Sequence, residues 1–263
     1  MPPDHREYPP PPTLKHAIKC FWSDTIEAGE LPSPVEILPD GCAEIIFHFG
    51  GICGTGKHRL PSPFMMGLLT EPVTLQARGR VSILAIRCYP WAVFDLLGLP
   101  AVSDSVRIFE HPIARLQHTL ASCVEHNRIE EALHHLAQHL STTSPPCDIM
   151  LERAGAAMRE ANGTLPVHAV AAAAHATVRT LERRFKQSAG RTVKEVSNVM
   201  RFEQVRNALF AQPTASIASL ASTLGYADQS HLNREFRRYA GTTPAAFARR
   251  RRPGVDIVGF VQA

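Results

Sequence analysis

An internal repeat in the C-terminal part of the chain restricts its possible folds more than any other feature. The segment LERRFKQSAGRTVKEV (181–196) aligns without gaps to LNREFRRYAGTTPAAF (232–247), 51 residues further on. The aligned pairs are Leu181 with Leu232, Arg183 with Arg234, Phe185 with Phe236, and Thr192 with Thr243. Upstream the offset is 50 residues, so the second copy has one extra residue in its turn. Two helix–turn–helix units, joined by a shared helix over about residues 192–211, account for this register.

The second copy shows the pattern of a helix–turn–helix unit most clearly. Its first helix, IASLASTLG (217–225), has apolar residues on one face and ends at Gly225, which can take the left-handed conformation. Asp228 is a suitable N-cap for the next helix. The inward-facing residues of that helix are predicted to be Leu232, Phe236 and Tyr239. The residues of its polar arc are Gln229, Ser230, Asn233, Arg234 and Arg237.

The first copy follows the same plan with different side chains. Thr177 is its candidate N-cap, and His175 stands where such a turn prefers glycine. The residues predicted to face inward are Val178, Leu181 and Phe185. The residues on the polar side are Arg179, Glu182, Arg183 and Lys186. This unit is the less regular of the two.

The polar faces have side chains suited to reading base edges. Arginine matches guanine O6 and N7, glutamine and asparagine match adenine N6 and N7, and Glu182 could accept from a cytosine amino group. The alternative is that both are ordinary solvated faces of a helical domain. Residues 151–252 hold 17 Lys and Arg against 7 Asp and Glu, whereas residues 1–150 hold 11 against 16. A matched pair of units in so basic a segment favours binding to a polyanion.

The remaining patterns predict an α+β N-terminal domain followed by an all-α domain. Strands are expected at VEIL (35–38), CAEIIFHFG (42–50), VTLQARG (73–79) and VSILAIRC (81–88), because these are short β-branched or aromatic runs between turn residues. Helices are expected over 91–99, 111–122 and 128–140. The predicted boundaries are a Pro-rich lead-in (1–12), a sensor or dimerisation domain (13–140), a linker (141–148), a DNA-binding domain (149–252) and a tail (253–263).

The segment IASLASTLGYADQSHLNREFRRYAGTTPAAF, within about residues 150–250, resembles the AraC/XylS family of bacterial transcription regulators. The resemblance implies two recognition helices, near 177–187 and 228–239, that bind double-stranded DNA. It places Arg179, Glu182, Arg183, Gln229, Ser230, Asn233 and Arg234 at the family's base-reading positions, and it implies RNA polymerase as a partner. A linking helix of about 20 residues spans about 30 Å, close to the spacing of about 34 Å between successive major grooves.

The N-terminal segment resembles a domain of unknown role found on some AraC-type regulators, with a Pro39–Asp40–Gly41 turn and a helix started by Pro90. In the strand after the turn, Ile45, Phe47 and Phe49 are expected on one face, and Glu44, Ile46 and His48 on the other. A pocket for a small-molecule effector is predicted from Glu44, His48, Arg87 and Trp91. The alternatives are that Trp91 belongs to the core and that Arg87 forms a surface pair.

Neither a cofactor nor a metal site is predicted. His135 and His139 have the spacing of a two-histidine metal face, but no H-E-x-x-H motif accompanies them, so a solvated amphipathic helix, or one used in a homodimer, is favoured. The six cysteines form no C-x-x-C pair and are expected to be free thiols. The chain starts with acidic residues and prolines, and contains no long apolar stretch, so a cytoplasmic protein without membrane contact is expected.

Two other functions stay open at this point. One is a DNA-tethered enzyme or cysteine-based sensor, with Cys42 or Cys88 as the reactive thiol, although no activating motif adjoins either residue. The other is an architectural DNA binder without ligand control.

Overall fold

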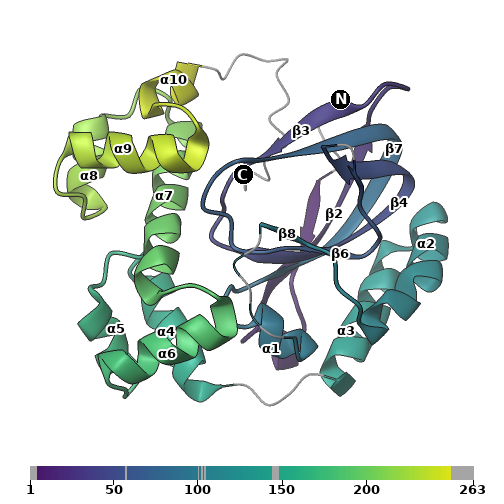
Figure 1. The fold of residues 1–263 in the computed structure, drawn as a ribbon, viewed down its shortest axis with the longest axis horizontal. Coiled ribbons are helices and arrows are strands. Elements are labelled where there is room, and N and C mark those ends of the chain that lie inside the picture. Colours follow the sequence, from purple (N-terminus) through teal and green to yellow (C-terminus); the bar gives the residue numbers. More distant parts are fainter. Residues whose placement is uncertain are drawn as a thin grey trace.

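The protein consists of an antiparallel β-sheet domain followed by a helical domain (Figure 1). The computed structural model describes residues 5–249, except residues 57, 100, 102, 104 and 144–147. Within the described part, eight strands form one sheet in the order β1-β2-β7-β4-β6-β8, with β3 paired to β7 and β5 to β4. The strands are β1 (Arg6–Tyr8), β2 (Ile18–Glu27), β3 (Ser33–Ile37), β4 (Ala43–Thr55), β5 (His58–Arg59), β6 (Phe64–Met66), β7 (Val73–Cys88) and β8 (Val106–Arg107). The predicted fold class is thus confirmed for both domains.

Strand β7 is the centre of the sheet and corrects the prediction of two strands over 73–79 and 81–88. It runs unbroken for 16 residues and pairs with β2, β3 and β4. Gly79 has a φ of +72°, and the register of β4 shifts opposite it, between Gly50 and Ile52. A Cβ on Gly51 would lie 2.2 Å from the carbonyl oxygen of Arg78. Glycines on both strands therefore absorb an irregularity that the sequence presents as a break.

Strand β2 is absent from the strands predicted from the sequence. Its sequence, IKCFWSDTIE, lacks a regular alternation because both faces of the strand are covered, and even Asp24 is buried. Phe21 packs in the cluster on one side of the sheet, whereas Trp22 packs in the cluster on the other.

The helices of the N-terminal domain cover one face of this sheet. They are α1 (Val93–Leu97), α2 (Gln117–Glu125) and α3 (Ile129–Thr143), and short 3-10 helices lie at Pro12–Leu14 and Pro112–Leu116. Ile45 and Phe47 of β4 face these helices, and Phe49 packs against the same cluster. Ile46 belongs to the cluster on the opposite face. The predicted alternation along β4 is confirmed.

The helical domain holds two compact units at the two ends of α7 (Figure 1). Its helices are α4 (Ile149–Glu160), α5 (Val167–Ala173), α6 (Val178–Ala189), α7 (Val193–Ala211), α8 (Ile217–Thr223), α9 (Gln229–Ala240) and α10 (Pro244–Arg249). Helix α7 matches the predicted linking helix, and it begins with a capping box between Thr192 and Glu195.

The predicted linker is shorter in the structure than expected. Residues 141–143 continue α3, and Asp148 already caps α4 by accepting from the amides of Met150 and Leu151. Residues 144–147 and the predicted tail (253–263) lie outside the described residues, as do residues 1–4 and 250–252.

The two domains are joined by side chains that cross between their cores. Trp91, which precedes α1, packs in the core of the helical domain, 6.0 Å from the ring of Phe185 on α6. It lies against Gly155 of α4, where a Cβ would be only 2.1 Å from its ring. Ser188 of α6 donates a hydrogen bond to Asp95 of α1. The N-terminal domain therefore supplies part of the hydrophobic core of the first helix–turn–helix unit.

A second contact lies at α7. Arg206 is buried and donates to the carbonyl oxygen of Pro39 at 2.8 Å. Lys19 of β2 forms an ion pair with Glu203, with 3.4 Å between Nζ and Oε1. The turn at Pro39–Asp40–Gly41 thus rests on the helix that links the two units.

Candidate nucleic-acid interface

The first unit, α5 and α6, forms as the repeat predicts. The hydroxyl of Thr177 accepts from the amide of Thr180 and caps α6. Leu181 and Phe185 are buried, but Val178 is 42% exposed, which corrects its predicted inward position. Val178 is the first residue of the helix, and the buried face of α6 begins at Leu181.

The turn of this unit contains a residue in a left-handed conformation. His175 has a φ of +52°, and Gly225 at the equivalent place in the second unit has +69°. A residue with a Cβ costs about 1 kcal/mol there relative to the right-handed region, whereas glycine does not. Both turns therefore adopt the same left-handed conformation, with a histidine in the first unit where the second has glycine.

The second unit, α8 and α9, is fixed to α7 by aromatic and ionic contacts. Asp228 accepts from the amide of His231 at 2.7 Å and caps α9. Phe202 of α7 contacts the rings of Phe236 and Tyr239, both at 5.1 Å between centroids. The buried positions predicted for Leu232, Phe236 and Tyr239 are confirmed.

Arg201, which was not among the predicted functional residues, positions the turn of the second unit. Its guanidinium stacks on Tyr226, 4.7 Å from the ring centroid, and donates to the carbonyl oxygen of Gly225 at 3.0 Å. It also donates to Asn198 at 2.7 Å. The signal in the sequence was an arginine on the linking helix, which is indistinguishable there from a surface residue.

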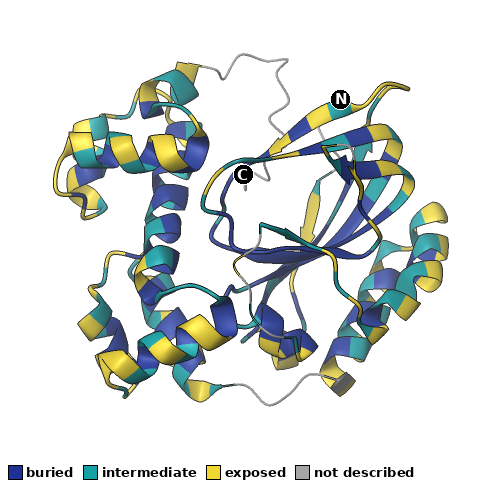
Figure 2. Cartoon of the chain, viewed as in Figure 1, coloured by how far each residue is buried: buried dark blue, intermediate teal, exposed yellow. Residues whose placement is uncertain are grey.

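The predicted reading side chains lie on the outer faces of α6 and α9, where Figure 2 shows bands of exposed residues. Arg179, Arg183 and Lys186 are exposed on α6, and so are Gln229, Ser230, Arg234 and Arg237 on α9, while Asn233 is half-buried. None of these cationic side chains forms an ion pair or hydrogen bond with another described residue. Two exposed basic faces with uncommitted donors, at the ends of one rigid helix, can bind phosphates and base edges.

Glu182 differs from the other predicted reading residues. It is half-buried, and its carboxylate accepts from the amide of Val193 at the start of α7, at 3.3 Å. The residue therefore stabilises the junction between α6 and α7, since a carboxylate at a helix N-terminus satisfies an otherwise unpaired N–H group.

The four predicted effector-binding residues do not share one pocket. Arg87 is 1% exposed, donates from Nε to Glu44 at 2.8 Å, and forms ion pairs with Glu7 and Asp40 at 2.7 and 3.4 Å. Trp22 also donates to Glu44. Trp91 belongs to the other core. Glu44 and Arg87 pair with each other because they lie directly opposite in the ladder of β4 and β7.

Burial and charge act against each other in this cluster. Burial raises the pKa of Glu44, and the adjacent Arg87 opposes that shift. For Arg87 burial favours loss of the proton, but Glu44 and Asp40 more than compensate and raise its pKa. The arginine therefore stays charged in the interior, paired with carboxylates from two strands and the Pro39–Gly41 turn.

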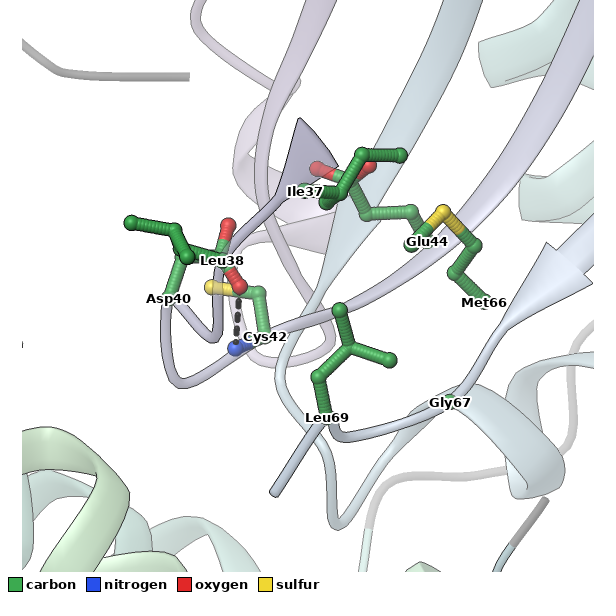
Figure 3. A pocket seen from close by; sticks show the side chains of 8 residues that line it. All are labelled: Ile37, Leu38, Asp40, Cys42, Glu44, Met66, Gly67 and Leu69. Carbon is green, nitrogen blue, oxygen red and sulfur yellow. Dashed lines mark hydrogen bonds between the residues drawn. The ribbon is translucent and has the colours of Figure 1, made fainter. Parts of the chain in front are cut away.

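Glu44 and His48 line separate hollows. Figure 3 shows the one beside the turn, where the amide of Cys42 donates to Asp40 at 3.0 Å. It is lined by Ile37, Leu38, Asp40, Cys42, Glu44, Met66, Gly67 and Leu69. His48 lies instead on an apolar cavity at the face of the sheet away from the helices, near Trp22 and Phe64, and it also lines a larger hollow beside Gln117. Burial lowers the pKa of His48, although it bonds to the carbonyls of Leu60 and Pro61.

The thiols considered as reactive groups lie in the interior. Cys42 and Cys88 are buried, and burial raises the pKa of both. A nucleophilic thiolate requires the opposite shift, together with access for a substrate. Cys147 lies outside the described residues. Among the helices that the structure describes, none is long and apolar enough to span a bilayer.

Comparison with known proteins gives two family matches, one in each domain. Residues 6–104 match a family described as a domain of unknown function (DUF6597), and residues 170–250 match a helix-turn-helix domain family. No curated protein matches the chain.

Several solved structures are similar. ToxT from Vibrio cholerae is 9% identical with a TM-score of 0.50, over 87% of this chain and 97% of that one, which shows a shared fold. The DNA-binding domain of AdpA, solved in complex with a target DNA, is 28% identical over 41% of this chain and 100% of its own, with a TM-score of 0.37. A DNA-binding transcriptional dual regulator from Escherichia coli K-12 is 16% identical over 41% and 96%, with a TM-score of 0.36.

Proposed function

We propose that this chain is an AraC-type helix-turn-helix transcription regulator with an N-terminal DUF6597 domain, and that it reads a bipartite DNA site by placing α6 and α9 in successive major grooves. The observation that carries the proposal is the matched pair of exposed basic helix faces at the two ends of α7. A single basic helix is a common surface feature, whereas two copies in the same local structure are suited to one extended ligand.

The length of the linking helix agrees with this arrangement. The 19 residues of α7 span about 28 Å at about 1.5 Å per residue. Successive major grooves on one face of DNA lie about 34 Å apart. Because α6 joins the start of α7 at Val193 and α9 packs on α7 at Phe202, the two faces are held apart along this helix, and we propose that they reach neighbouring grooves of one duplex.

We assign the roles of the side chains from their position and chemistry. Arg183 and Arg234 occupy equivalent places in the repeat and are proposed to contact guanine edges. Gln229, Ser230 and Asn233 lie in the first turns of α9, where side chains reach into the groove. Arg179, Lys186 and Arg237 are proposed to bind in or beside the groove, on bases or phosphates. Glu182 would contact a base only by releasing the amide of Val193. Of the predicted reading residues, we therefore consider it the least suited to a base contact.

A binding selection on randomised duplex DNA tests the proposal. The full chain is expected to return two short conserved blocks whose centres lie about 10 base pairs apart, one helical turn. Substitution of Arg183 should relax one block and substitution of Arg234 the other. An architectural binder would instead return no preferred sequence, and that result would contradict the proposal.

The N-terminal domain is proposed to control the DNA-binding units, by sensing a small molecule or by forming a homodimer. Its turn at Pro39–Asp40–Gly41 lies between two sets of groups. On one side Asp40 pairs with the buried Arg87. On the other, the carbonyl of Pro39 accepts from Arg206 of α7. A change inside the sheet that moves this turn therefore also moves the helix that sets the spacing of the units.

We place the effector site at the hollow of about 350 Å³ that His48 lines together with Arg59 and Gln117. The hollow in Figure 3 adjoins the turn but holds only about 10 Å³, the space of one water molecule. A ligand with hydrogen-bonding groups and an apolar part would suit the polar side chains of the larger hollow and its Phe49 and Leu60. Glu44, Arg87 and Trp91 are proposed to position the turn and the domain interface. A thermal-shift screen of metabolites tests this, with hits re-measured on His48→Gln. Absence of any hit, while sequence-specific DNA binding is intact, would contradict ligand control.

As a regulator of this kind the protein is expected to act in the cytoplasm, on double-stranded DNA and with RNA polymerase.

A further inference from the structure

The α2–α3 hairpin of the N-terminal domain brings together three side chains of the types that bind transition metals. Cys123 lies near the end of α2, and Glu131 and His135 lie four residues apart near the start of α3. One ligand atom from each of the three lies within 4.8 Å of the others. Glu131 Oε1 and His135 Nε2 are 3.9 Å apart. We propose that Cys123, Glu131 and His135 form a binding site for a divalent metal ion of the zinc class.

The geometry is close to that of a tetrahedral site. With bond lengths of about 2.3 Å to sulfur and about 2.0 Å to nitrogen and oxygen, the ligand atoms of such a site lie about 3.3–3.6 Å apart. Rotation of the exposed carboxylate and imidazole closes the remaining gap, so the helices need not move. Three protein ligands leave one position for water, as in exchangeable zinc sites.

Exposure is graded across the site in a way that suits an ion arriving from solvent. Cys123 is 1% exposed and packs in the core beneath the helices. The side chains of His135 and Glu131 are 34% and 46% exposed and form the entrance. The thiol therefore offers a sulfur ligand from the protein interior. The exposed carboxylate and imidazole can rotate to bind the ion as it arrives.

A neighbouring arginine orients the carboxylate. Arg128 donates to Glu131 Oε2 at 2.8 Å, which leaves Oε1 on the side of His135. Hydrogen bonds of this kind from surrounding residues fix ligating carboxylates in metal sites. With a thiolate and a carboxylate as ligands, the site compensates the two positive charges of the ion.

The pair considered from the sequence, His135 and His139, is not the one that forms the site. His139 lies against His111, with 6.3 Å between ring centroids and the rings perpendicular. His135 is directed to Glu131 and Cys123 instead. The sulfur ligand escaped the sequence analysis because it lies on another helix, 12 residues from His135 and outside any metal-binding motif.

The test is a titration of the full chain, reduced and stripped of metal, with Co²⁺. One equivalent of tightly bound Co²⁺ should produce a thiolate-to-metal charge-transfer band in the near ultraviolet, and Zn²⁺ should abolish it by displacement. Cys123→Ser should lose the band, and His135→Ala should lower the affinity at least tenfold. His134→Ala is the matched control, because His134 is exposed on the same helix next to His135 and should leave band and affinity unchanged.

Since Cys123 is buried, Cys123→Ser is checked for folding by circular dichroism, and Glu131→Gln provides a surface variant that does not disturb the core. Glu131→Gln should also weaken Co²⁺ binding at least tenfold. Zn²⁺ should raise the melting temperature of the parent protein and of His134→Ala, but not that of His135→Ala. A parent protein without the band, a band that survives in Cys123→Ser, or equal affinities in His134→Ala and His135→Ala would each overturn the proposal.

Discussion

Gly155→Ala is a direct test of the interface between the two domains. Gly155 lies on α4, and a Cβ there would be 2.1 Å from Cζ2 and 2.4 Å from Cε2 of Trp91. Those distances are impossible without movement of the ring or the helix. In the absence of the ring, alanine would be favoured over glycine in a helix by about 1 kcal/mol. The sign of the change in stability therefore reports whether Trp91 occupies this place.

The size of the effect follows from the cheapest way to relieve the clash. Overpacking of a filled core typically costs about 1–3 kcal/mol, because side chains leave their preferred rotamers. Expulsion of Trp91 would cost more, up to about 4–6 kcal/mol for about 150–250 Å² of ring surface at about 25 cal/mol per Å². Local strain is thus the expected response. After subtraction of the helix preference of about 1 kcal/mol from this cost, Gly155→Ala should destabilise the helical domain by up to about 2 kcal/mol.

Urea unfolding of the full chain, followed by circular dichroism, measures this change. Trp91→Leu removes the ring atoms that meet the new methyl group, so Gly155→Ala in that background should stabilise by up to about 1 kcal/mol. Ala156→Gly, at an exposed position one residue on, calibrates the helix preference alone. The reasoning is refuted if Gly155→Ala stabilises the parent protein as much as it stabilises Trp91→Leu.

Three further predictions concern the turn, the DNA contact and pH. His175→Gly should stabilise the helical domain by up to about 1 kcal/mol, because glycine accepts the left-handed backbone, and a loss of stability in urea would contradict this. Arg234→Ala should weaken binding to the selected DNA by about 1–3 kcal/mol, at one base position and without a matching loss on random DNA. Equal losses on both DNAs would show a phosphate contact only. Burial lowers the pKa of His48 below its ordinary 6.5, so the unfolded chain takes up this proton first and stability should fall as pH drops through 6.5. His48→Gln should flatten this dependence of the melting temperature, and an unchanged slope would assign it to other groups.

The helices of the C-terminal domain could be predicted from the sequence because the signals that define them are local. Helix caps such as Thr177 and Asp228 act within three residues of themselves, and the apolar period of a helix is visible within a few turns. The repeat then related two segments whose individual patterns were ambiguous. What the sequence did not reveal in this domain is Arg201, whose partners in the turn of the second unit lie 24 and 25 residues away.

The N-terminal domain could be predicted less well from the sequence, because the burial and pairing of its polar residues depend on partners that are distant in the chain. Alternation along β4 correctly predicted its two faces, but not that Glu44 would neutralise Arg87 on β7. Glu203 and Arg206 have the sequence appearance of a solvated helix face, yet both are buried against the other domain. A polar residue that is buried by another domain has no local signal, so the interface itself required the structure.

The central position of β7 also sets the order in which the chain can acquire its structure. The β2–β7 ladder joins Ile18 to Cys88, and the β4–β7 ladder joins Ala43 to the same residue. Closure of such long loops is slow compared with pairing of neighbouring helices. During synthesis β2 and β4 therefore remain separate until β7 begins to emerge, and their ladders with β7 are complete only when residue 88 has left the ribosome. Trp91 follows only three residues later, so the anchor for the helical domain emerges just as these central ladders are completed.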